Sequence, residues 1–190
     1  MSVQTLDNEP LFNNQSFASF LKEAQFVQCT VAADAQNRRV IHLAARSSEI
    51  CTIGVNVSCP LPDFMVWIQT PWKLMRYGET GHFKQHFDRS THVELPNGPV
   101  ETNCTVLLFP PARYSPFEGG DLSLHGQHEF YTIVPSTFEK WTLVIFLHKT
   151  LHTCATITKG TRYVLKTSAY IPDFPDEISS AFSKEGYALD

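Results

Sequence analysis

Two side chains that bind metals or carry protons stand close together in the stretch GHFKQHFDRS, residues 81–90: His86 and Asp88. Successive side chains of a strand point to opposite faces, so in a strand these two project from one face while Phe87 points into the opposite layer. An imidazole and a carboxylate on one face can hold one metal ion between them. The alternative is a surface pair whose members only hydrogen-bond each other, and the short pattern alone does not separate the two.

Further along the chain, His152 and Arg162 extend this pattern. His152 follows a hydrophobic run, and as a third ligand from a distant strand it would complete a two-histidine, one-carboxylate set. Such a set leaves positions on Fe(II) open for substrate, co-substrate and O2. Arg162 stands just beyond the turn expected at Lys159 and Gly160, and its guanidinium is a bidentate fork for a carboxylate. It could hold the far end of a dicarboxylate whose other end chelates the metal.

The segments that must position these residues read as strands. From residue 72 onward, short runs rich in β-branched and aromatic residues alternate with Gly, Pro and Asn clusters. Paired glycines in EGGDLSL, residues 118–124, allow a sharp bend or a positive φ just before a strand. Short strands without a helical period between them predict a sandwich or jelly roll of mostly antiparallel pairs. We expect strands at 73–77, 82–87, 104–109, 122–125, 129–134, 142–147, 153–158 and 161–170.

The N-terminal part has a different pattern. Phe17, Phe20, Leu21 and Ala24 recur at helical spacing within residues 15–25, which predicts an amphipathic helix that Asn14 caps and that covers an outer sheet face. Residues 49–57 fit a helix or a strand equally well, and residues 64–69 predict a helical turn that ends before a proline. The fold class that we expect is therefore mainly β with flanking N-terminal helices, a jelly roll. We expect one domain over residues 1–190, with helical or mixed support at 1–71, the jelly-roll core at 72–171 and an acidic tail at 172–190.

Composition narrows the class of protein. A chain of 190 residues can bury roughly two-thirds of its unfolded surface without disulfides or a structural metal, so a metal here would serve chemistry. The net charge of −4 provides no global basic field for nucleic acid or membrane. The five cysteines lack CxxC spacing, MSVQTLDNEP is no signal peptide, and no apolar run approaches the about 18 residues of a membrane span. We expect reduced thiols and a cytoplasmic or nuclear protein.

The ordered set Tyr77, His86, Asp88, Gly119-Gly120, His152, Gly160 and Arg162 resembles the prolyl 4-hydroxylase-like branch of the iron(II)/2-oxoglutarate-dependent dioxygenases. YGETGHFKQHFD is similar to that family's tyrosine, glycine turn and HxD motif, and HTCATITKGTRYVL is similar to its distal histidine, turn and basic residue. The similarity covers roughly residues 72–170. It implies a double-stranded β-helix, the jelly roll of this family.

The resemblance also implies roles for single residues. His86, Asp88 and His152 would bind Fe(II), Arg162 would pair with the C5 carboxylate of 2-oxoglutarate, and Tyr77 would hydrogen-bond that co-substrate. Many relatives carry a tyrosine on the strand that corresponds to TVLLF. This chain offers only Thr105 as a hydroxyl there, so the second partner of the carboxylate stays open.

The function implied is hydroxylation of a C–H bond with O2, with 2-oxoglutarate converted to succinate and CO2 and ascorbate as reductant. A protein or peptide is the expected substrate, with a prolyl side chain first, and a small-molecule substrate stays open. A nucleic-acid dealkylase is disfavoured, because that branch tends to show a second arginine six residues after the first, where Ser168 stands. A different class of answer is a non-catalytic jelly-roll module that binds a ligand or a partner protein. The sequence does not indicate the oligomeric state.

Two features of the sequence could instead indicate a zinc site. Cys154 could share the face of His152, where a thiolate would favour zinc over Fe(II), or it could be a small core residue. His82 with His86, and His148 with His152, form HxxxH pairs as in zinc hydrolases. Neither pair has a glutamate directly after its first histidine, and the strand-like surroundings would not bring the two imidazoles together.

Overall fold

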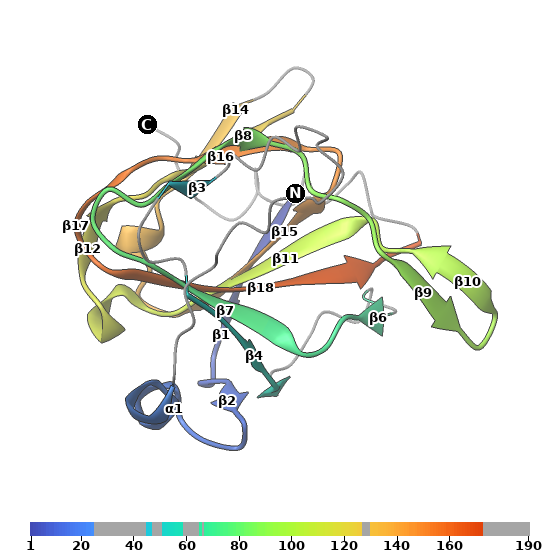
Figure 1. Cartoon of the computed structure of the whole chain (residues 1–190), viewed down its shortest axis with the longest axis horizontal. Helices are drawn as coiled ribbons and strands as arrows, with labels where there is room; N and C mark the ends of the chain where they lie inside the picture. Colours follow the sequence, from blue (N-terminus) through green and yellow to red (C-terminus); the bar gives the residue numbers. More distant parts are fainter. Residues whose placement is uncertain (25–44, 47–50, 59–64, 66, 127–129, 173–190) are drawn as a thin grey trace, which may run out of the picture.

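The computed structural model describes residues 1–24, 45–46, 51–58, 65, 67–126 and 130–172. One helix, two short 3-10 helices and a set of strands make up this part of the chain (Figure 1). The elements are β1 (Ser2–Leu6), β2 (Leu11–Phe12), α1 (Phe17–Glu23), β3 (Ala45–Arg46), β4 (Cys51–Val55), β5 (Val57–Ser58), β6 (Trp67–Ile68), β7 (Trp72–Tyr77), β8 (His82–His86), β9 (His92–Leu95), β10 (Gly98–Glu101), β11 (Cys104–Phe109), η1 (Ala112–Tyr114), β12 (Phe117–Gly119), β13 (Leu122–His125), β14 (Phe130–Ile133), η2 (Pro135–Thr137), β15 (Trp141–Leu147), β16 (Leu151–Cys154), β17 (Ile157–Gly160) and β18 (Arg162–Tyr170).

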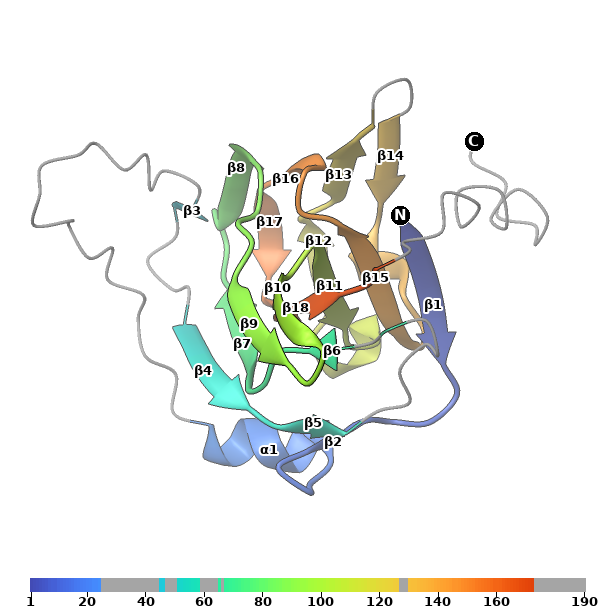
Figure 2. The ribbon, with the colours of Figure 1, turned by 90° about the vertical axis from the view of Figure 1, so that its right-hand side faces the viewer.

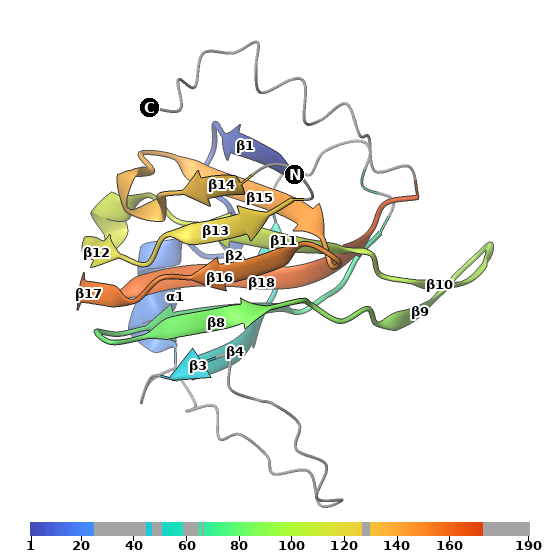
Figure 3. The same cartoon turned by 90° about the horizontal axis from the view of Figure 1, so that it is seen from above.

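Two antiparallel sheets face each other. The large sheet has the order β1-β15-β11-β18-β7-β4, with β6 beside β18, and the small sheet has the order β14-β13-β16-β8-β3. From β7 onward the chain alternates between the two, since β7, β11, β15 and β18 belong to the large sheet while β8, β13 and β16 belong to the small one (Figures 2 and 3). This winding is a double-stranded β-helix, so the jelly roll predicted from the sequence is confirmed.

Hydrophobic side chains lie on both faces of the large sheet. On β11, Cys104, Val106 and Leu108 pack into a cluster on the outer face, whereas Leu107 and Phe109 pack between the two sheets. A strand that is buried on both faces has no polar side to show, which explains the uninterrupted apolar run TVLLF. The interior between the sheets is where the predicted site residues of β7, β8, β16 and β18 lie.

The helix α1 covers the outer face of the large sheet, as expected (Figure 2). Phe17 and Phe20 are its buried residues, on the apolar face that the helical spacing predicted. The cap differs from the prediction: the hydroxyl of Ser16 accepts the backbone N–H of Ser19, and Asn14 lies outside the helix with a φ of 64°. It is the only helix, 3-10 turns aside, in the part of the chain described.

Phe17 is the side chain through which the helix is held. It is fully buried, with ring centroids 5.0 Å from both Phe12 and Trp141. Phe17→Ala should lower the free energy of unfolding by about 3–5 kcal/mol, because the cavity among these rings cannot collapse fully. Urea unfolding followed by fluorescence measures this. Phe130→Ala is the control: that ring is 60% exposed, so its loss should change stability by less than about 0.5 kcal/mol.

Two expectations for the region before β7 are now decided. The helical turn predicted at 64–69 is wrong, because Trp67–Ile68 forms the strand β6 and pairs with Ala169 and Tyr170 of β18. The segment 49–57, which fitted a helix or a strand, contains the strand β4 and the start of β5. Tertiary pairing at the sheet edge overrides weak local patterns of this kind.

The strand expected at 153–158 is two strands, β16 and β17. Ala155 leaves the ladder, and its N–H donates to the carbonyl of Asp121 instead, at 2.8 Å. Of the predicted tail, residues 173–190 lie outside the described residues, so its expectation stays open.

A hairpin of β9 and β10 follows Asp88 and projects away from the two sheets (Figures 1 and 3). Its base is fixed, since Thr91 N–H donates to the hydroxyl of Thr102 at 2.8 Å and Thr102 N–H donates to the carbonyl of Thr91 at 2.9 Å. Neither of these two strands is among those predicted from the sequence. Within the described residues, no helix is long and apolar enough to cross a membrane.

Candidate metal centre

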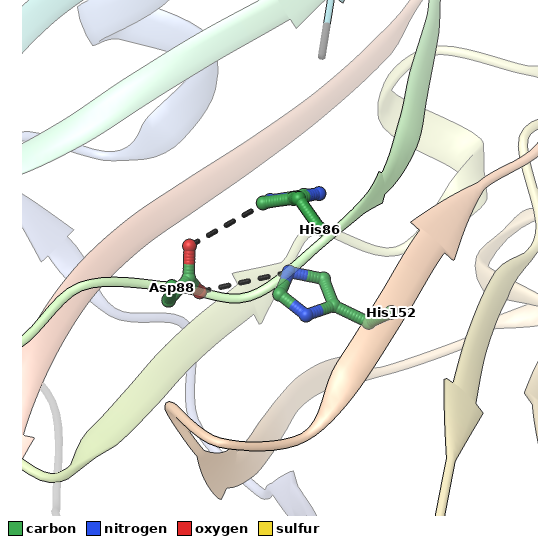
Figure 4. Close-up of side chains that lie close together, drawn as sticks. All are labelled: His86, Asp88 and His152. Carbon is green, nitrogen blue, oxygen red and sulfur yellow. Dashed lines mark ion pairs between the residues drawn. The ribbon is translucent and has the colours of Figure 1, made fainter. Parts of the chain in front are cut away.

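The structure brings His86, Asp88 and His152 together from two strands (Figure 4). His86 is the last residue of β8 and pairs in register with His152 of β16, so the two imidazoles project from one face of the small sheet. Asp88 follows β8, and its N–H donates to the carbonyl of His148 at 3.2 Å. One ligand atom of each of the three residues lies within 4.8 Å of the other two.

Hydrogen bonds to the backbone orient both imidazoles. Nδ1 of His86 lies 2.7 Å from the carbonyl oxygen of Lys84, and Nδ1 of His152 lies 2.9 Å from that of Thr150. A carbonyl only accepts, so each Nδ1 carries a proton, and Nε2 is the ring nitrogen that faces Asp88 and is placed to bind a metal. The Nε2 atoms lie 3.7 Å and 3.6 Å from the two carboxylate oxygens of Asp88, for His86 and His152 respectively.

The electrostatics suit a cation. Burial lowers the pKa of His152 to about 4, more than its backbone hydrogen bond and the charge of Asp88 raise it, so this imidazole is neutral at neutral pH. Burial raises the pKa of Asp88, but the nearby imidazole of His86, the charge of Lys166 and the hydrogen bonds from Lys166 and Thr105 outweigh it and hold that pKa well below its usual value. Two imidazole nitrogens and one carboxylate are a donor set for Fe(II) that leaves coordination positions open.

Asp88 has two further partners that the sequence analysis did not assign to it. The hydroxyl of Thr105, on β11, donates to Oδ2 at 2.5 Å, and Nζ of Lys166, on β18, lies 2.5 Å from Oδ1. Thr105 had been considered only as a partner of the co-substrate. In the structure it donates to the carboxylate of Asp88.

Phe87 departs from the expectation. The ring was expected in a buried layer opposite the ligands, but it is 58% exposed. The reason is that β8 ends at His86, so Phe87 lies beyond the last paired residue of the small sheet.

Arg162 begins β18 and is fully buried between the sheets, with 2% exposure. One of its terminal nitrogens, Nη1, donates to the carbonyl of Gly120 at 2.5 Å, and its guanidinium carbon lies 4.6 Å from the ring centre of Tyr77, its register partner on β7. Its Nε has no hydrogen-bond partner, and no carboxylate pairs with it in the described part of the chain. A buried charge is stable only when an anion or several acceptors compensate it, so this guanidinium fits an anionic group.

Tyr77 lies beside Arg162. The ring is 2% exposed, and its face stabilises the guanidinium by a cation–π contact. The hydroxyl lies 3.5 Å from the sulfur of Met75. A hydrogen bond from Tyr77 to the co-substrate stays a prediction.

The backbone of the paired glycines packs closely against its neighbours beside Arg162. Gly119 and Gly120 have φ of 75° and 73°, which is the positive φ that EGGDLSL predicted. A Cβ at Gly119 would overlap the carbonyl oxygen of Thr156, and one at Gly120 would overlap the side chain of Ile157. Both positions therefore require glycine.

Gly120→Ala tests the close packing around Gly120. We expect it to destabilise the fold by about 1–3 kcal/mol and to displace the carbonyl that holds Arg162. Urea unfolding measures the loss. Gly98→Ala is the matched control, because Gly98 also has a positive φ, of 114°, but a Cβ there meets nothing within 4 Å. A loss no larger than that of the control would contradict the crowding at Gly120.

Comparison with known proteins assigns the family. Residues 72–168, more than half of the chain, match the 2OG-Fe(II) oxygenase superfamily. The chain belongs to this superfamily. Fe(II) and 2-oxoglutarate are therefore the cofactor and co-substrate that the family implies, and the group of His86, Asp88 and His152 fits the metal.

Solved structures with a similar arrangement are distant. A 2OG-Fe(II) oxygenase family oxidoreductase from Burkholderia pseudomallei is 15% identical, with a TM-score of 0.41 over 55% of this chain and 43% of its own. A prolyl hydroxylase in complex with a hypoxia inducible factor oxygen degradation domain peptide fragment, from Trichoplax adhaerens, is 19% identical, with a TM-score of 0.38 over 62% of this chain and 50% of its own. The oxygenase thus matches half or less of each of these chains. No curated protein matched its sequence.

The zinc-based alternatives find no support in the geometry. Among the described residues, the only group with metal-binding spacing is His86, Asp88 and His152. Cys154 packs against the core between the sheets, as the small-residue interpretation expected, and does not join that group. His82 and His148 lie outside it as well, so neither HxxxH pair forms a site.

Proposed function

We propose that this oxygenase hydroxylates a C–H bond of a polypeptide, with a prolyl side chain as the first candidate. The observation that carries the proposal is the pairing of the three-ligand group with a buried guanidinium that has no anionic partner in the described residues, inside one jelly roll. In this proposal His86, Asp88 and His152 hold Fe(II), and Arg162 holds the C5 carboxylate of 2-oxoglutarate. When bound, Fe(II), 2-oxoglutarate and O2 supply the oxidising chemistry, which inserts one oxygen atom into the C–H bond and releases succinate and CO2.

Residues around the proposed site orient the metal ligands and Arg162 and limit the access of water. The backbone carbonyls of Lys84 and Thr150 hold the two imidazoles in one tautomer, so their Nε2 lone pairs need no reorganisation to bind a metal. The carbonyl of Gly120 and the ring of Tyr77 hold Arg162 in place before an anion arrives. Apolar side chains pack between the sheets and limit the access of water to Arg162, which is 2% exposed.

The surroundings of the ligands support a large substrate. The side chain of His86 is 23% exposed, whereas those of Asp88 and His152 are 10% and 6% exposed, so the group opens to solvent on the side of His86. Phe87 presents an exposed ring next to it, and the hairpin of β9 and β10 projects from the same segment. Loops and hairpins around a site are where recognition of a peptide takes place. The cysteine spacing, which lacks CxxC pairs, supports the proposal of a cytoplasmic or nuclear location.

Mass spectrometry of proline-containing peptides tests the substrate. Incubation with the enzyme, Fe(II), 2-oxoglutarate and ascorbate should add one oxygen atom to a peptide, and amino-acid analysis should locate it as hydroxyproline. The matched peptide with alanine for proline should stay unchanged. Oxygen added to the alanine peptide, or only to small molecules, would contradict the prolyl assignment. Absence of any Fe(II)-dependent succinate formation would instead support a non-catalytic module.

A further inference from the structure

Asp88 is held by both sheets at once. The two imidazoles that face its carboxylate come from the small sheet, whereas Thr105 and Lys166 reach it from β11 and β18 of the large sheet. Each carboxylate oxygen has one donor from the large sheet: Oδ2 accepts from Thr105 and Oδ1 from Lys166. The carboxylate therefore has a fixed orientation and, on Oδ1, a cationic neighbour.

The position of Lys166 follows from the strand period. Side chains of β18 alternate between the outer cluster and the interior, and Arg162, Val164 and Lys166 share the interior face. Register places Lys166 beside Leu107 of β11 and Lys73 of β7. The side chain is 26% exposed, but its ammonium ends 2.5 Å from a carboxylate that is 10% exposed. Such a largely buried pair is screened much less than a surface pair.

A divalent metal and the ammonium of Lys166 would both bind the carboxylate of Asp88. Either cation alone neutralises the charge of the carboxylate. When both are present they repel each other, because only a few ångströms of poorly solvated protein separate them. Thr105 differs, because its neutral hydroxyl can stay on Oδ2 whichever cation is present. We propose that Lys166 is the counter-ion of Asp88 when no metal is bound, and that it competes with the metal for this carboxylate. The inference rests on the metal site of the proposed function.

The competition predicts the sign of a measurable effect. Removing the ammonium leaves Asp88 buried without its cation in the metal-free protein, which destabilises that form. In the metal-loaded protein the metal itself neutralises Asp88, so the loss of Lys166 changes that form less and relieves a repulsion. Metal binding to the variant should therefore be tighter, and the stabilisation on metal binding larger, than in the wild type.

Lys166→Met, titrated with Mn(II), tests the inference. Mn(II) can occupy an N/O site of the kind that binds Fe(II), with lower affinity, and it is not readily oxidised by O2. The concentration of free Mn(II) is measured by electron paramagnetic resonance. We expect the dissociation constant to fall about tenfold, and the rise in Tm at saturating Mn(II) to grow by roughly 3–6 °C. Lys166→Arg, which keeps the charge, should behave as the wild type. Lys73→Met removes an exposed lysine from the neighbouring strand and should change neither quantity.

The outcomes separate the inference from the proposed function. If the wild type binds no Mn(II), or binds it equally well after His152→Ala, the metal site itself is wrong. If the wild type binds Mn(II) through His152 but Lys166→Met binds it equally or less tightly, the competition is refuted. A Lys166→Met protein that folds only with Mn(II) supports it. Should that variant not fold at all, Lys166→Gln gives the same measurement, and an unchanged affinity there refutes the inference.

Discussion

Asp88→Asn should lower Fe(II)-dependent succinate formation by about a hundredfold or more. Removing a group that only supports a ligand already costs roughly 10–100-fold in metal affinity or activity, and Asp88 is the one anionic group of the proposed ligand set. The amide keeps the size of the side chain but loses its charge, and it leaves the ammonium of Lys166 without its partner. Succinate release and Mn(II) titration measure the two losses.

Glu94→Gln is the matched control for this variant. It makes the same change from acid to amide on the hairpin strand β9, where the side chain is 76% exposed and pairs only with His92 in the described residues. It should leave metal affinity unchanged. Asp88→Asn with Mn(II) affinity within about threefold of the wild type would show that the carboxylate is no metal ligand.

Arg162→Met should raise the 2-oxoglutarate concentration needed for half-maximal turnover by about 10–100-fold while Mn(II) affinity stays within about twofold. Hydrogen bonds to a charged group contribute about 1.5–3 kcal/mol, and a guanidinium offers two of them to one carboxylate. Methionine fills a similar apolar volume, so the space between the sheets is kept. Kinetics at varied 2-oxoglutarate and a parallel Mn(II) titration give the two numbers.

Two further variants define what Arg162 does. Arg162→Lys should recover part of the 2-oxoglutarate affinity, because it restores the charge but not the planar fork. Arg113→Met removes an exposed arginine that donates to the carbonyl of Glu139, and it should have no effect on either quantity. Equal loss of metal and 2-oxoglutarate affinity in Arg162→Met would contradict its role as co-substrate anchor.

The strand period and the family resemblance together predicted which residues meet. Because side chains repeat every second residue, HxD placed His86 and Asp88 on one face, and the structure adds His152 through the direct register with His86. The strands at 104–109 and 122–125 were predicted with the bounds that the structure shows, since each lies between clear turn residues. The positive φ of the paired glycines was also predicted correctly.

Other features depend on contacts that no local pattern encodes. Lys166 lies two strand periods beyond Arg162 and so shares its face, which was a usable signal, but its carboxylate partner is 78 residues away in the chain. The N-terminal strand β1 forms at the edge of the large sheet beside β15, and the short strand β6 forms because it pairs with the end of β18 that β7 does not reach. The exposed ring of Phe87 follows from where the pairing of β8 ends, which the alternation of residues does not reveal.

The central claim is that one chain binds one Fe(II) on His86, Asp88 and His152, with 2-oxoglutarate reaching it from Arg162. An anaerobic titration tests it most directly, because an Fe(II) complex with a 2-oxoacid absorbs visible light by charge transfer. The account predicts that this absorption appears with wild-type protein, saturates at one iron per chain, disappears in His152→Ala, and needs more 2-oxoglutarate in Arg162→Met. No absorption in the wild type, or undiminished absorption in His152→Ala, would contradict it.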